Sequence, residues 1–296
     1  PTSQLIIHRS LVTDKPSPFP AHWHESIELM CFRRGMCDVR IDTRSYSAHA
    51  GDVVCINSNQ IHYLLLEQPV RYHALIISPA FLKGIGLPDD VSLVPLIRDP
   101  QISELFETVI TENRERLPFY RTAQNAAVSS LMVQLCRNYR NRDPSVGRDA
   151  AHNSKVRLVR QCMDYINRHY LDGISTSDIS REIGITVNYL CACFKDVTNM
   201  TIKKYINSMK CRDAEAMLSS GRYTVTEAGL HCGFDNMAYF AKMYRLMIGE
   251  NPSVTAEKSK AAASTEKPSK RARDTSDMHI PVAEAGTSGI PHATKS

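Results

Sequence analysis

Histidine and glutamate side chains near the N-terminus are spaced as the ligands of a metal ion or a small polar molecule would be. They lie in the segment His22-Trp-His-Glu-Ser-Ile-Glu28. Alternate side chains of a β-strand point to the same face, so we expect His22, His24 and Glu28 to point inward together. Imidazole nitrogens and carboxylate oxygens are common ligands of Zn, Fe and Mn ions.

This segment resembles the first motif of cupin barrels, His-x-His-x3-Glu. The stretch Gly51-Asp-Val-Val-Cys-Ile-Asn-Ser-Asn-Gln-Ile-His62 resembles the second motif, with Asn57 where proline is common. The resemblance implies that His62 joins the other three side chains, and in cupin enzymes such a set holds the metal. We predict that these four residues line an effector pocket. No bound cofactor is expected, and a divalent metal ion in the barrel stays an open alternative.

Short segments rich in apolar and β-branched residues follow one another up to residue 85. Glycine, asparagine and proline separate them, which is typical of strands joined by turns. The predicted strands are 27–32, 37–41, 52–56 and 71–78. Short strands at this spacing indicate a small sandwich or barrel. We therefore predict a cupin-like, effector-binding barrel over residues 1–85.

Two amphipathic helices are expected between residues 86 and 140. Apolar residues recur at helical spacing over 101–115 and again over 123–140. Their stripes could cover the core of the barrel, or they could pair with a second subunit. A polar segment with proline, glycine and serine, 141–154, reads as a linker.

Two helix-turn-helix units are predicted in the C-terminal half, over 176–195 and 224–245. Each has a glycine in its turn, Gly184 and Gly233, which lie 49 residues apart. A residue without Cβ adopts the positive φ of a tight turn at low cost. Between the units, 202–219 reads as one helix, about 27 Å long at about 1.5 Å per residue. One turn of B-DNA is about 34 Å, so such a helix could set two recognition helices into neighbouring major-groove segments.

The residues from about Val156 to Ser253 resemble the DNA-binding domain of the AraC/XylS family of transcription regulators. The matching pieces include 190–195, Gly233-Phe234, Tyr239-Phe240 and Gly249-Glu-Asn-Pro252. Cys191 and Ala192 stand where the family often has a Ser-Arg or Gln-Arg pair. Pro252 is followed by Ser-Val-Thr, where Pro-x-x-Tyr-Arg is usual. The family implies a dimer, with its interface in the helical subdomain 86–140.

The DNA contacts are expected on the second helix of each unit. Asparagine can read adenine with two hydrogen bonds, alanine can touch a thymine methyl group, and lysine and arginine can hold phosphates. The predicted DNA-binding residues are Thr186, Asn188, Cys191, Ala192, Lys195, Asp235, Asn236, Met237, Lys242 and Arg245.

Length and composition limit the class of protein. A chain of 296 residues indicates two domains, and its net charge of +5 is mild. Nine cysteines at irregular spacing favour reduced thiols in the cytoplasm over a disulfide framework. No apolar run approaches the ~18 residues of a membrane span, and no signal peptide or membrane partner is expected. Residues 259–296 have few large apolar side chains and are predicted to be a disordered tail.

These observations predict an α+β multidomain protein with a cupin-like β-barrel, a helical subdomain and an all-α tandem helix-turn-helix domain over residues 155–258. We expect a transcription regulator rather than an enzyme. Activation is more usual than repression in the resembling family. Its predicted partners are double-stranded DNA, a small effector such as a sugar or metabolite, a second copy of the chain and RNA polymerase. The alternatives are a metal-dependent cupin dioxygenase or isomerase, and a DNA-repair or methyl-transfer protein, for which no cysteine has an activating setting.

Overall fold

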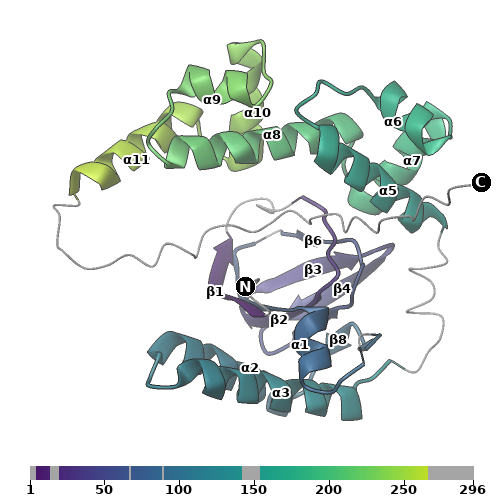
Figure 1. Cartoon of the computed structure of the whole chain (residues 1–296), viewed down its shortest axis with the longest axis vertical. Coiled ribbons are helices and arrows are strands. Elements are labelled where there is room, and N and C mark those ends of the chain that lie inside the picture. Colours follow the sequence, from purple (N-terminus) through teal and green to yellow (C-terminus); the bar gives the residue numbers. More distant parts are fainter. Residues whose placement is uncertain (1–4, 14–19, 67, 89, 142–153, 266–296) are drawn as a thin grey trace, which may run out of the picture.

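The computed structural model describes residues 5–13, 20–66, 68–88, 90–141 and 154–265, in a β-rich region followed by a helical one (Figure 1). The β-rich region contains two antiparallel sheets, with strand orders β1-β7-β2-β5-β8 and β4-β3-β6. This arrangement confirms the predicted fold class. The strands are β1 (Leu5–Thr13), β2 (Ile27–Arg34), β3 (Met36–Ile41), β4 (Arg44–His49), β5 (Val53–Ile56), β6 (His62–Leu65), β7 (Val70–Ile77) and β8 (Leu96–Ile97).

Strands β2 and β5 of the five-stranded sheet are buried on both faces, which explains why they are almost continuously apolar. On β2, Met30 and Phe32 pack against the three-stranded sheet, together with residues of β3 such as Val39. Leu29 and Cys31 point the opposite way and pack against helices. Glu28 has the parity of Met30, so it lies on the face between the two sheets.

Three helices follow β7 and cover the outer face of the five-stranded sheet. They are α1 (Pro79–Gly84), α2 (Pro100–Glu115) and α3 (Tyr120–Asn138). Phe106 of α2 and Leu131 of α3 belong to the same buried cluster as Leu29 of β2. The apolar stripes of these helices are therefore covered by the chain's own sheet. Strand β8 also lies within the predicted helical subdomain and pairs with β5, so the two predicted N-terminal units share one core.

The helical region lies on the other side of the β-strands from α2 and α3 (Figure 1). Its helices are α5 (Ser154–His169), α6 (Thr176–Ile183), α7 (Val187–Thr198), α8 (Ile202–Ser219), α9 (Val225–His231), α10 (Met237–Ile248) and α11 (Pro252–Thr265). Helices α5 to α7 form one unit and α9 to α11 another, and α8 runs between them (Figure 1). The bounds of α8 agree with the sequence prediction.

The two turns are alike in backbone conformation. Gly184 and Gly233 have φ angles of +78° and +71°. The corresponding core residues of the two units, Leu190 with Phe240 and Phe194 with Tyr244, are fully buried. The internal repeat therefore consists of two similar packed units.

Three sequence predictions need correction or lie outside the described residues. His22 forms only an isolated bridge with His62, and His24 lies outside the strands, where its Nδ1 bonds to the carbonyl oxygen of Ser26 two residues on. Residues 259–265 continue α11 instead of starting a disordered tail, since Ala261–Ala263 are strong helix formers. Residues 142–153 of the linker and 266–296 of the tail lie outside the described residues. Among the residues described, no helix is both long and apolar enough to cross a membrane.

Candidate effector and DNA-binding sites

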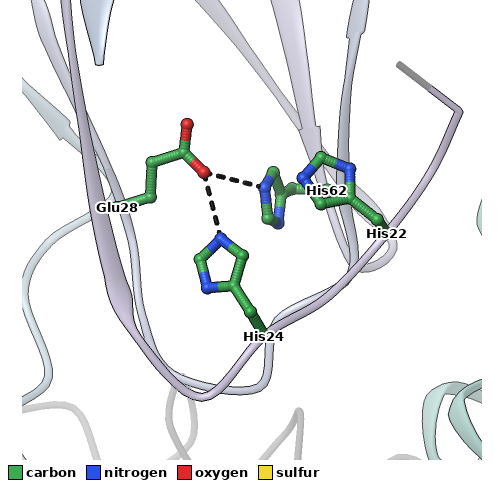
Figure 2. Close-up of side chains that lie close together, drawn as sticks. All are labelled: His22, His24, Glu28 and His62. Atoms are coloured by element: carbon green, nitrogen blue, oxygen red, sulfur yellow. Dashed lines mark hydrogen bonds and ion pairs between the residues drawn. The ribbon is translucent and has the colours of Figure 1, made fainter. Parts of the chain in front are cut away.

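Three imidazoles and one carboxylate converge at one end of the β-rich region (Figure 2). Each of His22, His24, Glu28 and His62 offers one ligand atom, and these atoms lie within 4.8 Å of one another. The Nε2 atoms of His24 and His62 lie 3.1 and 3.2 Å from Oε2 of Glu28. We call these four residues the His–Glu cluster. The structure therefore brings together all four side chains that the sequence predicted.

Backbone contacts hold the cluster in place. The backbones of His22 and His62 exchange two hydrogen bonds of 3.1 and 2.9 Å. The carbonyl oxygen of His24 accepts a hydrogen bond of 2.8 Å from the amide of Asn59. Glu28 is fixed by its place in β2. The parity argument from the sequence was thus right for Glu28, but the two first histidines reach the site from a loop.

The orientation of each imidazole is set by its Nδ1 atom. Nδ1 of His22, His24 and His62 lies 3.0, 2.9 and 3.0 Å from the carbonyl oxygens of Pro20, Ser26 and Gln60 respectively. A carbonyl oxygen can only accept, so each Nδ1 carries a proton. In a neutral ring, Nε2 then bears the lone pair. Histidine ligands of metals commonly have this arrangement, with a backbone carbonyl fixing the tautomer.

The electrostatics of the cluster are those of a buried ion pair beside a neutral ring. Burial alone would raise the pKa of Glu28, but hydrogen bonds from His24 and His62 outweigh it and hold that pKa well below its usual range. Burial would lower the pKa of His62, but its hydrogen bond and charge interaction with Glu28 outweigh it and raise the pKa. Burial and the neighbouring His62 lower the pKa of His22 to about 3. The His22 ring is therefore neutral and able to donate its lone pair.

The space between the two sheets is filled by apolar side chains. Phe32, Val39, Ile56, Tyr72 and their neighbours form one buried cluster there. The His–Glu cluster lies at its edge, where polar side chains meet. An open hollow of about 440 Å³ lies elsewhere, on the surface of α2 and α3, between residues such as Glu104 and Gln134. The His–Glu cluster is thus compact, and its ligand atoms, within 4.8 Å of one another, could surround only a small ligand.

The predicted DNA-binding residues of the first unit lie on the solvent side of α7. Thr186, Asn188, Cys191, Ala192 and Lys195 are exposed, whereas Cys193 and Phe194 face the core. Thr186 is the N-cap of α7, and its hydroxyl accepts a hydrogen bond from the amide of Tyr189.

In the second unit, Asp235, Asn236, Lys242 and Arg245 are exposed. Asn236 is the N-cap of α10, and its Oδ1 accepts a hydrogen bond of 2.9 Å from the amide of Tyr239. That bond leaves its amide group for other contacts. Met237 is only half-exposed and packs against the core of this unit, so it is less available to DNA than the sequence prediction implied.

The sequence prediction overlooked two exposed tyrosines on these helices and one buried lysine beneath the second turn. Tyr189 and Tyr239 are 51% and 38% exposed on α7 and α10, and their rings can contact a DNA backbone or base edge. The buried Lys210 of α8 donates a hydrogen bond of 3.0 Å to the carbonyl oxygen of Gly233, and so holds the second turn. Tyr189 follows Asn188, and Tyr239 lies two residues after Met237, so their positions in the sequence could have predicted them as contact residues.

Comparisons with known proteins agree with this two-part arrangement. The family model of the AraC-like ligand-binding domain matches residues 15–146, and that of a helix-turn-helix domain matches residues 179–258. The HTH-type transcriptional regulator YdiP of Escherichia coli is 22% identical over 242 residues, which cover 78% of this chain and 79% of YdiP. The chain belongs to the AraC family of transcription regulators.

Another relative is the arabinose operon regulatory protein of Escherichia coli. It is 20% identical over 237 residues, which cover 74% of this chain and 76% of that protein. The crystal structure of an apo variant of ToxT from Vibrio cholerae aligns with a TM-score of 0.50 at 12% identity, over 86% of this chain and 98% of ToxT. This likeness shows a common fold. As a member of the AraC family, the chain is a DNA-binding regulator with a ligand-binding domain and not an enzyme.

Proposed function

We propose that this AraC-family protein is a transcription activator that binds DNA as a homodimer and is controlled by a small effector at the His–Glu cluster. The observation that supports it best is that the two recognition helices, α7 and α10, carry exposed predicted contact residues. They belong to two similar units that α8 joins (Figure 1). At about 1.5 Å per residue, the 18 residues of α8 span about 27 Å. That length is close to one turn of B-DNA, about 34 Å, so both recognition helices can enter the major groove on one side of the duplex.

The two recognition helices would read DNA with different chemistry. Asn188 and Ala192 of α7 can contact an adenine edge and a thymine methyl group. On α10, Lys242 can reach a base edge or a phosphate, while Arg245 holds the backbone. Both sets extend into solvent, and neither is covered by the β-rich region.

The apolar stripes of α2 and α3 are already covered by the five-stranded sheet. In a dimer, a second copy would therefore contact the opposite, outward faces of these helices. Two DNA-binding domains would then be presented to two half-sites. The effector acts by binding one arrangement of the dimer better than another, which shifts the population between them. The DNA-bound activator would recruit RNA polymerase. Because DNA and RNA polymerase are both cytoplasmic, the protein would work in the cytoplasm.

Footprinting on DNA that flanks the protein's own gene tests this proposal. We expect protection of direct repeats, with the pattern changed by one member of a panel of sugars, metabolites and ions. Transcription from the same fragment with purified RNA polymerase tests activation, and sedimentation tests the dimer. Absence of any sequence preference at low ionic strength would contradict DNA-binding regulation. Lower transcription with the protein bound would make it a repressor.

A further inference from the structure

The two domains touch beside the His–Glu cluster. Trp23 lies between His22 and His24 in the chain, and the guanidinium of Arg160 on α5 stacks 5.7 Å from the centre of its ring. Arg160 Nη1 also donates a hydrogen bond of 3.1 Å to the carbonyl oxygen of Asn59. The indole of Trp23 in turn donates a hydrogen bond to Asp164, one turn further along α5. One arginine thus contacts both loops that carry the histidines.

Those loops are also joined to each other at the cluster. The amide of Asn59 donates to the carbonyl oxygen of His24, and Nδ1 of His62 donates to that of Gln60. The buried Asp42 accepts hydrogen bonds from the side chain of Gln60, at 3.2 Å, and the amide of Ile61, at 2.9 Å. The positive charge of Arg160 interacts with the same carboxylate. His24 and His62 are therefore connected by hydrogen bonds to the groups that contact Arg160.

An apolar layer accompanies these polar contacts. Ala21, Ile61 and Tyr63 of the β-rich region belong to the same buried cluster as Val159 of α5 and Leu190 of α7. The core of the first helix-turn-helix unit is thus continuous with the edge of the β-rich region. The second unit has its own core, built from α8 to α11. The first unit is therefore the one that the His–Glu cluster can influence through direct packing.

The donor set of the cluster fits one transition-metal ion. Three imidazoles with Nδ1 held by carbonyl oxygens present Nε2, and Glu28 adds a carboxylate oxygen, all within 4.8 Å. A bound metal ion would replace the protons that Nε2 of His24 and His62 share with Glu28. Bonds of about 2.0–2.2 Å to Zn²⁺ would place the ligand atoms of one tetrahedral shell about 3.3–3.6 Å apart, so the four side chains would draw slightly closer around the ion. Such a set suits Zn²⁺, Fe²⁺ or Mn²⁺, and a sugar ring would need more room.

We propose that a divalent transition-metal ion bound by His22, His24, Glu28 and His62 is the effector, and that its binding controls how the DNA-binding domain docks on the β-rich region through Arg160. This inference rests on the proposed function, since it names the effector of the same site. The ion fixes the two loops that present Trp23 and Asn59 to α5. Because coupling of binding free energies is reciprocal, docking strengthens metal binding as metal binding strengthens docking.

The metal site is tested first, on the full chain. Protein freed of metal with a chelator is dialysed against ZnCl₂, FeCl₂ under argon or MnCl₂, and bound metal is measured by mass spectrometry. We expect about one ion per chain for at least one of the three metals, and at least tenfold weaker binding in His24→Ala and Glu28→Gln. His49→Ala is the matched control, because His49 is half-exposed and paired with Asp52 outside the cluster. Circular dichroism checks that each variant is folded.

The coupling is tested with Arg160→Ala, which leaves all four ligands in place. Arg157→Ala is its control, since Arg157 is exposed on the same helix. We expect the retained metal to change the affinity for the footprinted DNA about tenfold in the wild type and in Arg157→Ala, and less than twofold in Arg160→Ala. Trp23 is the chain's single tryptophan, so its fluorescence reports on the contact directly. Metal should shift its emission more in the wild type than in Arg160→Ala.

Each outcome decides one part of the proposal. If folded wild-type protein retains none of the three metals, the metal site is wrong. If metal binds but DNA affinity and Trp23 emission respond equally in the wild type and Arg160→Ala, the route through Arg160 is wrong. If no specific DNA binding is found with or without metal, the proposed function fails, while metal stoichiometry and Trp23 emission still judge the site and its coupling.

Discussion

The turn glycine of the first helix-turn-helix unit has open space beside it, whereas that of the second has Lys210 beside it. An alanine Cβ built at Gly184 would meet no atom within 4 Å, but at Gly233 it would lie 2.9 Å from Nζ of Lys210. The first unit obtains its support from the β-rich region, through the core that α5 and Ile61 share. The second is held within the helical region by Lys210 and α11. The first unit is therefore placed to respond to the His–Glu cluster, and the second unit is held independently of that cluster.

The recognition helices differ in the same sense. Among the predicted contacts, α7 carries one positive side chain, Lys195, and α10 carries two, Lys242 and Arg245. Positive side chains supply most of the sequence-independent affinity for DNA. We interpret the second unit as the anchor on DNA and the first as the unit whose engagement depends on the effector. Each prediction below compares residues of the two units.

The largest difference is expected at the turn glycines. Gly233→Ala costs about 1–2 kcal/mol for a left-handed alanine, plus about 1–2 kcal/mol for loss of the Lys210 hydrogen bond. Gly184→Ala costs only the backbone strain. Hydrogen exchange measured by mass spectrometry should show α9 and α10 opening about 100-fold more often in Gly233→Ala, since each 1.4 kcal/mol is tenfold. Equal effects at the two glycines would show that Lys210 does not hold the second turn.

Lysines on the two recognition helices should differ in what their loss changes. Lys242→Ala is expected to weaken specific binding by about 1–3 kcal/mol if the lysine reads a base. Lys195→Ala should weaken binding to all DNA alike and reduce the salt slope by about 1, as loss of one phosphate contact does. Fluorescence anisotropy on the footprinted site and on random DNA at several salt concentrations separates the two. A selective loss at Lys195 would reverse the assignment.

The sequence predicted the helical region well, because its signals are local. Glycines, apolar residues at helical spacing and a length of 18 residues fixed α8, and the N-cap residues Thr186 and Asn236 were both among the predicted contacts. The end of α11 was missed because the absence of large apolar side chains was taken for disorder, although alanine favours a helix without them.

The β-rich region was harder to predict, because its pairings are long-range. Strand β1 pairs with β7, and nothing in Leu5–Thr13 alone indicates that partner. The His–Glu cluster was found from its motif, although the expected strand around His22 and His24 does not exist. The contact between Arg160 and Asn59, which are 101 residues apart, left no pattern in the sequence. The sequence does not distinguish an exposed arginine from one that joins two domains, because its partner is known only from the fold.

A smaller difference is expected at the matched core aromatics, Phe194 and Tyr244. The hydroxyl of Tyr244 bonds at 2.9 Å to Oγ1 of Thr255, which also contacts Glu250. Tyr244→Phe makes the second unit resemble the first and removes that bond, at a cost of about 1 kcal/mol. The reverse change, Phe194→Tyr, adds a hydroxyl to a fully buried position and should cost at least as much. Urea unfolding followed by hydrogen exchange measures both, and an unchanged Tyr244→Phe would show that α11 is held by apolar packing alone.

The smallest difference is expected where the units are most alike, at the start of α6 and α9. Ser175 and Thr224 form capping boxes with Asp178 and Glu227. Ser175→Ala and Thr224→Ala should each cost about 1 kcal/mol at neutral pH. The side-chain hydrogen bond from Ser175 lowers the pKa of Asp178, and the backbone and side-chain hydrogen bonds from Thr224 lower that of Glu227.

Because both carboxyl pKa values are lowered by folding, their contribution is full above the unfolded values, near 4, and is lost as pH falls through the folded values. The part of each variant's cost that depends on the carboxylate should therefore disappear in both units below about pH 4, while the part due to the hydroxyl bond with the N3 amide should remain. Parallel pH profiles of hydrogen exchange would show that the units begin from equivalent helix starts. The difference between the first unit, which packs on the β-rich region, and the second, which anchors on DNA, would then arise only from their turns and from the residues that pack against them. A cost that does not change with pH in one unit would mean that its cap is held by the hydroxyl alone.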